Sequence, residues 1–308
     1  MKMTEPIGQT ATVLRGTLRF NEPMAKHVTW RAGGVAARAY VPADLADLAA
    51  FLETLPGGEP VCCVGLGSNL LVRDGGFRGT VILLHSTRAV LRFEGELIYA
   101  EAGVACPKVA RFAATHGLEG AEFLAGVPGT MGGALAMNAG CYGSETWGIV
   151  ERVRTISRAG RPSERSPAEF EIGYRHVDLR AAKLGENEWF AAAWLRFRPG
   201  EAKLARRRIT DLLARRIASQ PLELPNAGSV FRNPAGDHAA RLIEACGLKG
   251  YAVGAARISE KHANFIVNPK GRGRAADIEA LIDHARAEVK ARFGVELVSE
   301  VRIVGDRA

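Results

Sequence analysis

The segment "EFLAGVPGTMGGALAMNAGCYG", residues 122–143, decides the fold of this chain. Its glycines, interspersed with alanines, leave almost no side-chain bulk, and they stand at Gly126, Gly129, Gly132, Gly133, Gly140 and Gly143. Glycine costs backbone entropy, so such a run indicates close approach of the backbone to a flat ligand or to another helix. Thr130 can cap a helix here, and a helix start with free amides suits an anion. This stretch alone leaves ligand contact and tight helix packing both open.

A second glycine loop, "VGLGSNLLV" at residues 64–72, precedes it. It begins like a dinucleotide-binding fingerprint, but the third glycine is missing and the residues after it resemble extended chain. No Gly-Lys-Ser/Thr follows, which excludes a P-loop. What remains is a loop whose backbone amides can converge on a phosphate, with Ser68 and Asn69 as further donors, or a plain turn. Two such loops in one domain favour a ligand.

Helix and strand patterns around these loops predict an α+β protein. We expect helices at residues 44–58, 107–117, 204–220, 237–247 and 275–293, and strands at 61–65, 80–86, 97–104, 150–158, 188–197, 264–268 and 296–304. Strict strand–helix–strand alternation is absent, which argues against a doubly wound sheet. The pattern changes near "FRPGEA", residues 197–202, and this change predicts a domain boundary at 200–204.

Composition limits the function classes. The chain has 308 residues and no apolar run of the roughly 20 residues that cross a bilayer. Its first residues lack the pattern of a secretory signal, so we expect a cytoplasmic protein without a membrane partner. Five cysteines without a C-x-x-C pair suggest neither a disulfide framework nor a zinc site, and we expect no metal. The net charge of +8 suits a nucleic acid, a phosphorylated cofactor or a nucleotide-sugar.

Six motifs in fixed order resemble those of the UDP-N-acetylenolpyruvoylglucosamine reductase family, flavoenzymes that make UDP-N-acetylmuramate for peptidoglycan. The motifs are "GLGSNLLV", "GVPGTMGGALAMNAG", "GYRH", "NAGSVFRNP", "KHANFIVN" and "SEVRIVG", and the resemblance runs from residue 29 to residue 305. Each motif is modest alone, but the six in this order are specific. The chain lacks the extra tyrosine-bearing loop of the longer subclass and so resembles the shorter one.

The resemblance implies an FAD-binding region of the vanillyl-alcohol oxidase and p-cresol methylhydroxylase type, in two subdomains, followed by a smaller α+β substrate domain. We therefore expect an N-terminal extension at 1–25, the FAD-binding region at 26–203 with a split near 86, the substrate domain at 204–294, and a C-terminal strand with Glu300 at 295–308. FAD is the implied bound cofactor and NADPH the co-substrate. The implied partner is a nucleotide-sugar, with no nucleic acid and no obligatory protein partner.

The resemblance also assigns roles to individual residues. Arg175, Ser229 and Glu300 match the catalytic positions, where Ser229 would donate a proton and Arg175 and Glu300 would stabilise the intermediate. The implied cofactor contacts are Gly65, Gly67, Ser68, Asn69, Gly126, Gly129, Thr130, Gly132, Gly133, Asn138 and Gly140; the implied substrate contacts are Tyr174, Arg232, Asn233, Lys261 and His262. After "GYRH" this chain has Val177 where many members have a serine.

Other interpretations of the same residues stay open at this point. Without the resemblance, Arg175 would be a surface ion pair, Glu300 would pair with Arg302 in solvent, and Ser229 would stabilise a turn. Lys261 and His262 could meet a phosphate or make structural hydrogen bonds. Another FAD oxidase or dehydrogenase of the same fold would share the glycine loops but would not need the three catalytic residues. A basic nucleic-acid-binding protein rests on charge alone, without a recognition motif.

Overall fold

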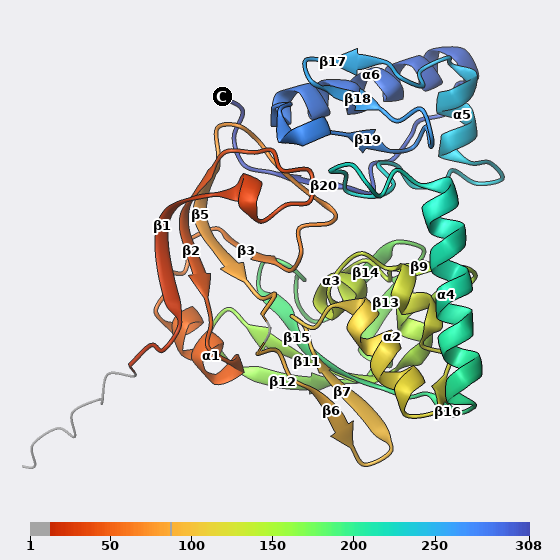
Figure 1. Ribbon diagram of the computed structural model, residues 1–308. Coiled ribbons are helices and arrows are strands. Elements are labelled where there is room, and N and C mark those ends of the chain that lie inside the picture. The colour runs from red at the N-terminus through yellow and green to blue at the C-terminus, as the bar shows by residue number, and fades with distance from the viewer. Residues whose placement is uncertain (1–12, 87) are drawn as a thin grey trace, which may run out of the picture.

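The first sheet carries the 65–69 loop at the end of one of its strands. The computed structural model describes residues 13–86 and 88–308. The strands of this sheet lie in the order β1 (Thr17–Pro23), β2 (Val35–Val41), β5 (Phe77–Leu83) and β3 (Val61–Val64), and only the pair β1 and β2 is antiparallel. Helix α1 (Leu45–Glu53) connects β2 to β3, and the Asp44 carboxylate caps it by accepting from the Asp47 amide at 2.9 Å. Figure 1 shows this unit in red and orange.

The second sheet is antiparallel and lies beside the first. Its order is β12 (Pro162–Arg165), β11 (Val150–Ser157), β15 (Glu188–Leu195), β7 (Leu97–Glu101) and β6 (Leu91–Glu94). Every residue of β15, which the sequence predicted as a strand, is buried. The reason is that Trp189 and Ala191 pack in a cluster with Tyr40 and Ile82 of the first sheet, while Leu195 packs under the helices of the second unit.

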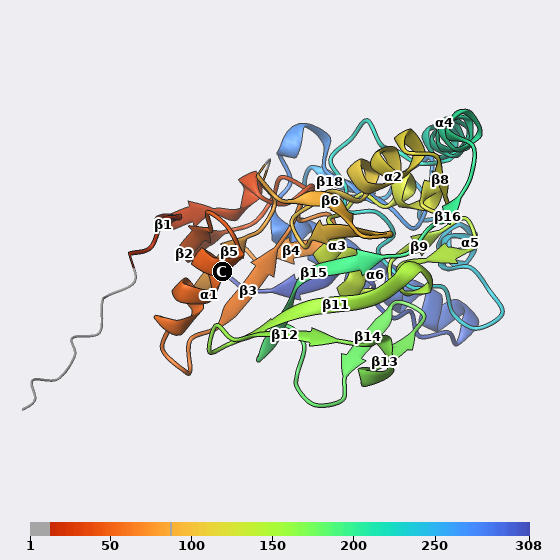
Figure 2. The same ribbon diagram turned by 90° about the horizontal axis from the view of Figure 1, so that it is seen from below.

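Helices and a hairpin complete the second unit. Helices α2 (Cys106–Thr115) and α4 (Ala202–Ser219) lie on one side of β11 and β15 in Figure 2, and the short α3 (Met131–Ala136) contacts β15. The hairpin of β13 (Phe170–Gly173) and β14 (His176–Leu179) joins the same core through Phe170 and Val177. Shorter elements are the pairs β8 (Leu118–Glu119) with β16 (Arg198–Pro199) and β9 (Gly140–Cys141) with β10 (Ser144–Glu145), and the 3-10 helices Met24–Lys26, Glu122–Gly126, Thr146–Ile149, Pro167–Glu169 and Pro269–Gly271.

The C-terminal unit, blue in Figure 1, packs a small sheet against helices. Its elements are α5 (Ala239–Ala245), β17 (Ala252–Val253), β18 (Ala256–Ile258), β19 (Ile266–Val267) and α6 (Ala275–Phe293). Gly294 ends α6 in a left-handed conformation, with φ of 67°, as its position in the sequence predicts. The buried Trp30 of the first unit donates its indole N–H to the carbonyl of Ile266 at 2.7 Å, which ties the two units together.

Three segments lie elsewhere than the predicted boundaries suggest. Residues 1–12 of the expected N-terminal extension lie outside the described residues, but residues 17–23 are strand β1 of the first sheet, because they pair with β2 from Thr17 to Pro23. Helix α4 belongs to the second unit, because Ala205 and Ile209 are buried in the core that α2 shares. The expected strand over 296–304 is reduced to β20 (Arg302–Val304), which pairs in parallel with β4 (Leu70–Val72) of the first unit. The expected split near 86 falls between β5 and β6.

None of the helices within residues 13–86 and 88–308 is both long enough and apolar enough to cross a membrane. The same residues contain no group of three or more His, Cys, Asp and Glu side chains arranged to hold a metal ion.

Candidate active site

The two glycine loops pack against each other. A Cβ atom added to Gly65 would lie 2.2 Å from the Thr130 hydroxyl oxygen, and one added to Gly129 would lie 3.3 Å from that of Ser68. Gly67 adopts a φ of 62°, and a side chain there would meet the carbonyl of His27. Glycine is therefore required at Gly65 and Gly67 because the neighbouring chain occupies the space of a side chain.

A basic cleft of about 730 Å³ opens beside these loops. Gly65, Ser68, Pro128 and the segment 222–228 contribute to its wall, and its basic lining residues are Arg19, Lys26, His27, Arg31, His85 and Arg216. Glu223 is the carboxylate among the lining residues. The volume lies in the range of cofactor pockets, and the excess of positive charge attracts phosphate groups. The cleft thus fits a phosphorylated cofactor.

The start of α3 has two of its first amides engaged within the protein. The amides of Met131 and Gly132 donate to the carbonyls of Val104 and Ala102 at 2.8 and 2.9 Å, and Thr130 stands at the N-cap without a capping bond from its side chain. A Cβ on Gly132 would lie 2.8 Å from that of Ala102, whereas one on Gly133 would meet nothing within 4 Å. Gly132 therefore serves tight packing, and only Gly133 of this pair has open space beside it.

Arg175 lies in the two-residue turn between β13 and β14, with a φ of 55°. Its Nε donates to Glu300 Oε1 at 3.0 Å, Nη1 to the carbonyl of Asn138 at 3.3 Å, and Nη2 to the carbonyl of Gly140 at 2.7 Å. A guanidinium has five N–H groups, so these three bonds leave two for a ligand. Arg175 is therefore fixed in place and still able to bind a carboxylate.

Glu300 comes from the far end of the chain, 125 residues from Arg175. Its amide donates to the carbonyl of Val230 at 2.8 Å, and its own carbonyl accepts from the Asn69 side chain at 3.0 Å. Burial raises the pKa of Glu300 and the neighbouring Arg175 lowers it, and the net shift is upward. Glu300 is thus paired with Arg175 inside the protein, and the alternative of an exposed pair with Arg302 is wrong.

The segment that carries Ser229 runs alongside the residues before β20. Phe231 and Ser299 form an antiparallel bridge, and the Arg232 amide donates to the carbonyl of Val298 at 2.9 Å. This pairing places the half-buried Ser229 near Glu300 along the two paired segments. Arg232 Nε is buried without a hydrogen-bond partner in the described part of the chain, and its charge lowers the pKa of Glu300. A buried donor without a partner is costly, so Arg232 would gain from a ligand that accepts a hydrogen bond from it.

Other predicted substrate contacts already have partners in the protein. The Asn233 side chain accepts from the Ala239 amide at 3.1 Å, and Lys261 donates to the carbonyl of Ile217 at 2.6 Å. His262 accepts from the Asn264 amide at 3.3 Å, and burial lowers its pKa. Tyr174 is half exposed, with the Arg175 guanidinium 5.0 Å from its ring centroid. Of these residues, Tyr174 is the one that the structure brings to Arg175.

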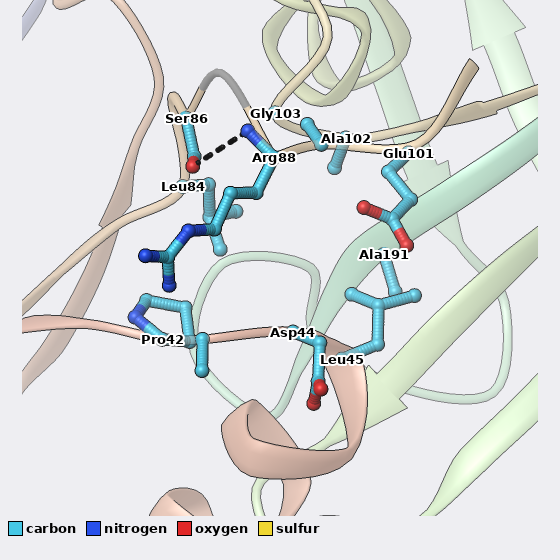
Figure 3. Close-up of a pocket in the computed structure, with 12 residues that line it drawn as sticks. Pro42, Asp44, Leu45, Leu84, Ser86, Arg88, Glu101, Ala102, Gly103 and Ala191 are labelled. Carbon is cyan, nitrogen blue, oxygen red and sulfur yellow. Dashed lines mark hydrogen bonds between the residues drawn. The ribbon is translucent and has the colours of Figure 1, made fainter. Parts of the chain in front are cut away.

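A second, smaller cavity lies between the first two units, shown in Figure 3. It measures about 30 Å³ and is lined by residues that include Asp44, Arg88 and Glu101. None of the predicted site residues lines it. A space of this size holds about one water molecule, so it does not compete with the basic cleft as a site.

Sequence reasoning missed Arg216 in the cleft wall. None of the site residues predicted from the sequence lies within the expected helix at 204–220. Arg216, however, follows the buried Ile209 by seven residues and therefore shares its face of α4. Burial lowers the pKa of Arg216, which lines the cleft. The seven-residue spacing was the signal that could have found it.

An FAD binding domain model matches residues 36–163. The fold and the basic cleft therefore define an FAD-binding protein. The model of the UDP-N-acetylenolpyruvoylglucosamine reductase C-terminal domain matches residues 220–304, and the reductase of that name from Thiobacillus denitrificans is 56% identical over 321 residues, covering 100% of this chain and 98% of its own length. The chain belongs to the UDP-N-acetylenolpyruvoylglucosamine reductase family.

Further relatives extend the likeness to a solved structure. The reductase from Legionella pneumophila subsp. pneumophila is 52% identical, covering 99% of this chain and 98% of its own. The crystal structure of UDP-N-acetylenolpyruvylglucosamine reductase from Thermus caldophilus superposes with a TM-score of 0.77 at 30% identity, over 94% of this chain and 99% of that one. The C-terminal model begins at residue 220, directly after α4 ends.

Proposed function

We propose that this protein reduces UDP-N-acetylenolpyruvoylglucosamine to UDP-N-acetylmuramate with NADPH and bound FAD, a step of peptidoglycan precursor synthesis. One observation carries the proposal: Arg175 and Glu300, 125 residues apart, meet at 3.0 Å against the end of the second glycine loop. Another FAD oxidase has no need of this pair. The reaction consumes NADPH and a nucleotide-sugar and the five cysteines are free thiols, so we infer that it takes place in the cytoplasm.

The glycine loops and the basic cleft would hold FAD. Gly65, Ser68 and Gly129 offer backbone close to the cleft, and Lys26, Arg31 and Arg216 supply positive charge for phosphates and the flavin edge. We infer that the matched C-terminal range, residues 220–304, carries most of the substrate contacts, among which Arg232 is supported by its unpartnered Nε. No nucleic acid, membrane or obligatory protein partner forms part of the proposal.

Arg175 would bind and polarise the substrate carboxylate. Bound FAD would supply the redox chemistry, namely hydride transfer from NADPH to the terminal carbon of the enolpyruvyl group. Negative charge then moves into the adjoining carboxylate. The two free N–H groups of Arg175 suit this carboxylate, because the planar guanidinium matches it and keeps its charge. Fixed donors at developing charge are among the largest contributions to catalysis.

Glu300 would lie beside the same substrate carboxylate. Two unpaired negative charges in a buried site repel each other, so Glu300 needs either a proton or a cation beside it. Burial raises its pKa toward the protonated form, and Arg175 supplies the cation. In the protonated form Glu300 donates a hydrogen bond to the substrate, whereas in the ionised form it orients Arg175.

Ser229 would donate the proton that completes the reduction. The carbon that neighbours the new C–H bond becomes a strong base after hydride addition, so a weakly acidic hydroxyl in the right place is sufficient. The left-handed Gly228, with φ of 73°, and the Asn226 side chain, which accepts from the Gly228 amide at 2.9 Å, fix the turn before Ser229. No activating base is required for this role.

Anaerobic stopped-flow measurement of both half-reactions tests the proposal. Purified protein should be yellow, NADPH should reduce its flavin, and UDP-N-acetylenolpyruvoylglucosamine should reoxidise it. Ser229→Ala should leave flavin reduction intact and slow product formation by about a hundredfold or more. NADPH consumption with oxygen as sole acceptor would instead favour an oxidase, and a colourless protein that FAD cannot reconstitute would remove both flavoenzyme functions.

A further inference from the structure

The side chain of Asn138 is fully engaged within the protein. Its Nδ2 donates to Glu145 Oε2 at 2.8 Å and to the carbonyl of Gly173 at 3.1 Å, and its Oδ1 accepts from the Trp147 amide at 3.1 Å. An amide nitrogen has two hydrogens, so Asn138 has none left to donate to a cofactor. The residue is 2% exposed. Asn138 was predicted from the resemblance as a cofactor contact; in this geometry its side-chain amide hydrogens are used within the protein.

One of these side-chain contacts and one main-chain contact link Asn138 to Arg175. Gly173 is the last residue of β13, directly before the Tyr174–Arg175 turn, and Asn138 holds its carbonyl. The main-chain carbonyl of Asn138 also accepts from Arg175 Nη1. One residue therefore fixes both the base of the turn and the guanidinium at its tip.

Both residues of this contact have a positive φ, 41° at Asn138 and 55° at Arg175. Asparagine tolerates this conformation, whereas arginine adopts it only when its surroundings hold it there. Val177, on β14, is buried among apolar side chains and gives the turn packing but no side-chain hydrogen bond. The β13–β14 pairing closes the turn, and the bond from the Asn138 side chain to the Gly173 carbonyl adds a polar link at its base.

We propose that Asn138 is a positioning residue for Arg175: it sets the guanidinium against the substrate carboxylate and acts on the substrate half-reaction rather than on FAD binding. The inference rests on the proposed function, since it requires that Arg175 meets the substrate. A displacement of about 1 Å in a reacting group commonly lowers the rate by roughly a hundredfold.

Asn138→Gly tests this directly. Glycine adopts the left-handed backbone without strain and keeps the carbonyl that Arg175 uses, so the variant removes the side-chain bonds to Gly173, Glu145 and the Trp147 amide and leaves the main-chain bond to Arg175. We expect reoxidation of the reduced flavin by UDP-N-acetylenolpyruvoylglucosamine to slow roughly ten- to hundredfold, and calorimetric titration of that substrate into the oxidised enzyme to show weaker binding. FAD content and flavin reduction by NADPH should not change.

Asn21→Gly is the matched control. Asn21 also has a positive φ, of 51°, but it is exposed on the edge strand β1. The same substitution there should alter neither half-reaction. Glu145→Ala, which removes one acceptor of Asn138 from an exposed position, should slow reoxidation in the same direction by a smaller factor, and it serves as the second variant if Asn138→Gly does not fold.

A double variant separates positioning from general structure. In an Arg175→Ala background, Asn138→Gly should cost no further activity, because its effect passes through Arg175. Equal losses in both half-reactions, loss of FAD, or additive losses in the double variant would each overturn the inference. Failure of the proposed function looks different: the reduced wild-type enzyme itself would not be reoxidised by the substrate.

Discussion

Two arginine–glutamate pairs join the C-terminal unit to the rest of the molecule, and they differ in kind. Glu279, on α6, accepts from Arg73 through Nε and Nη2, both at 3.0 Å, and from Arg307 at 2.8 Å. Glu300 has one arginine, bound through Nε alone at 3.0 Å. The first pair lies at the junction with the first unit, where Asp74 also caps α6, and the second lies at the site.

Their carboxyl pKa values shift in opposite directions. Hydrogen bonds from Arg73 lower the pKa of Glu279 despite its burial, whereas burial raises the pKa of Glu300 despite Arg175. A buried carboxylate with too few donors costs stability, and one with several repays its desolvation. The junction pair is therefore structural, and the site pair keeps binding capacity unused for a ligand.

Arg175→Ala should give the largest effect. It removes the donor to the developing carboxylate charge, so we expect reoxidation by substrate to slow about a thousandfold, with flavin reduction by NADPH unchanged. Stopped-flow absorbance of each half-reaction measures this. Arg73→Ala is the counterpart at the junction and should lower the melting temperature while the folded enzyme keeps its rate. If Arg73→Ala slowed reoxidation as much as Arg175→Ala does, the junction pair would not be purely structural, and the distinction between the two pairs would be wrong.

Glu300→Gln should slow reoxidation by about a hundredfold without loss of stability. Because the folded-state pKa of Glu300 is raised, its ionised form costs stability at neutral pH, and this cost disappears as pH falls through that pKa. The variant should therefore melt at or above the wild-type temperature at pH 7, with the difference shrinking on acidification. Thermal melts from neutral to acidic pH check the sign of this stability difference. A variant that melts below the wild-type temperature at pH 7 would contradict the prediction.

Glu279→Gln should lose about 1–3 kcal/mol of unfolding free energy at pH 7 and keep its rate. The folded-state pKa of Glu279 is lowered, so its stabilisation is present above its unfolded pKa and is lost as pH falls through the folded value. Denaturant titrations across pH measure this, with Glu296→Gln, whose partner Lys290 is exposed, as a control that should not change. If Glu279→Gln left the unfolding free energy unchanged, the junction pair would not be structural and the difference between the two pairs would be lost.

Local chemistry made much of the fold predictable. The Asp44 cap of α1, the Gly294 end of α6 and the extended chain of Leu70–Val72 follow from rules that act within a few residues. The boundaries could not be placed in the same way. Whether residues 17–23 form a strand, and which unit α4 packs on, depends on partners distant in the chain.

The sequence by itself determined the family, through six motifs in order, and the residue types of the site. Only the tertiary structure decided which partners those residues have. It pairs Glu300 with Arg175 rather than with Arg302, bonds the Asn138 side chain to the Gly173 carbonyl, and places Arg216 in the lining of the cleft. The physical reason is that a hydrogen bond or a buried charge is defined by its partner, and these partners lie up to 125 residues away.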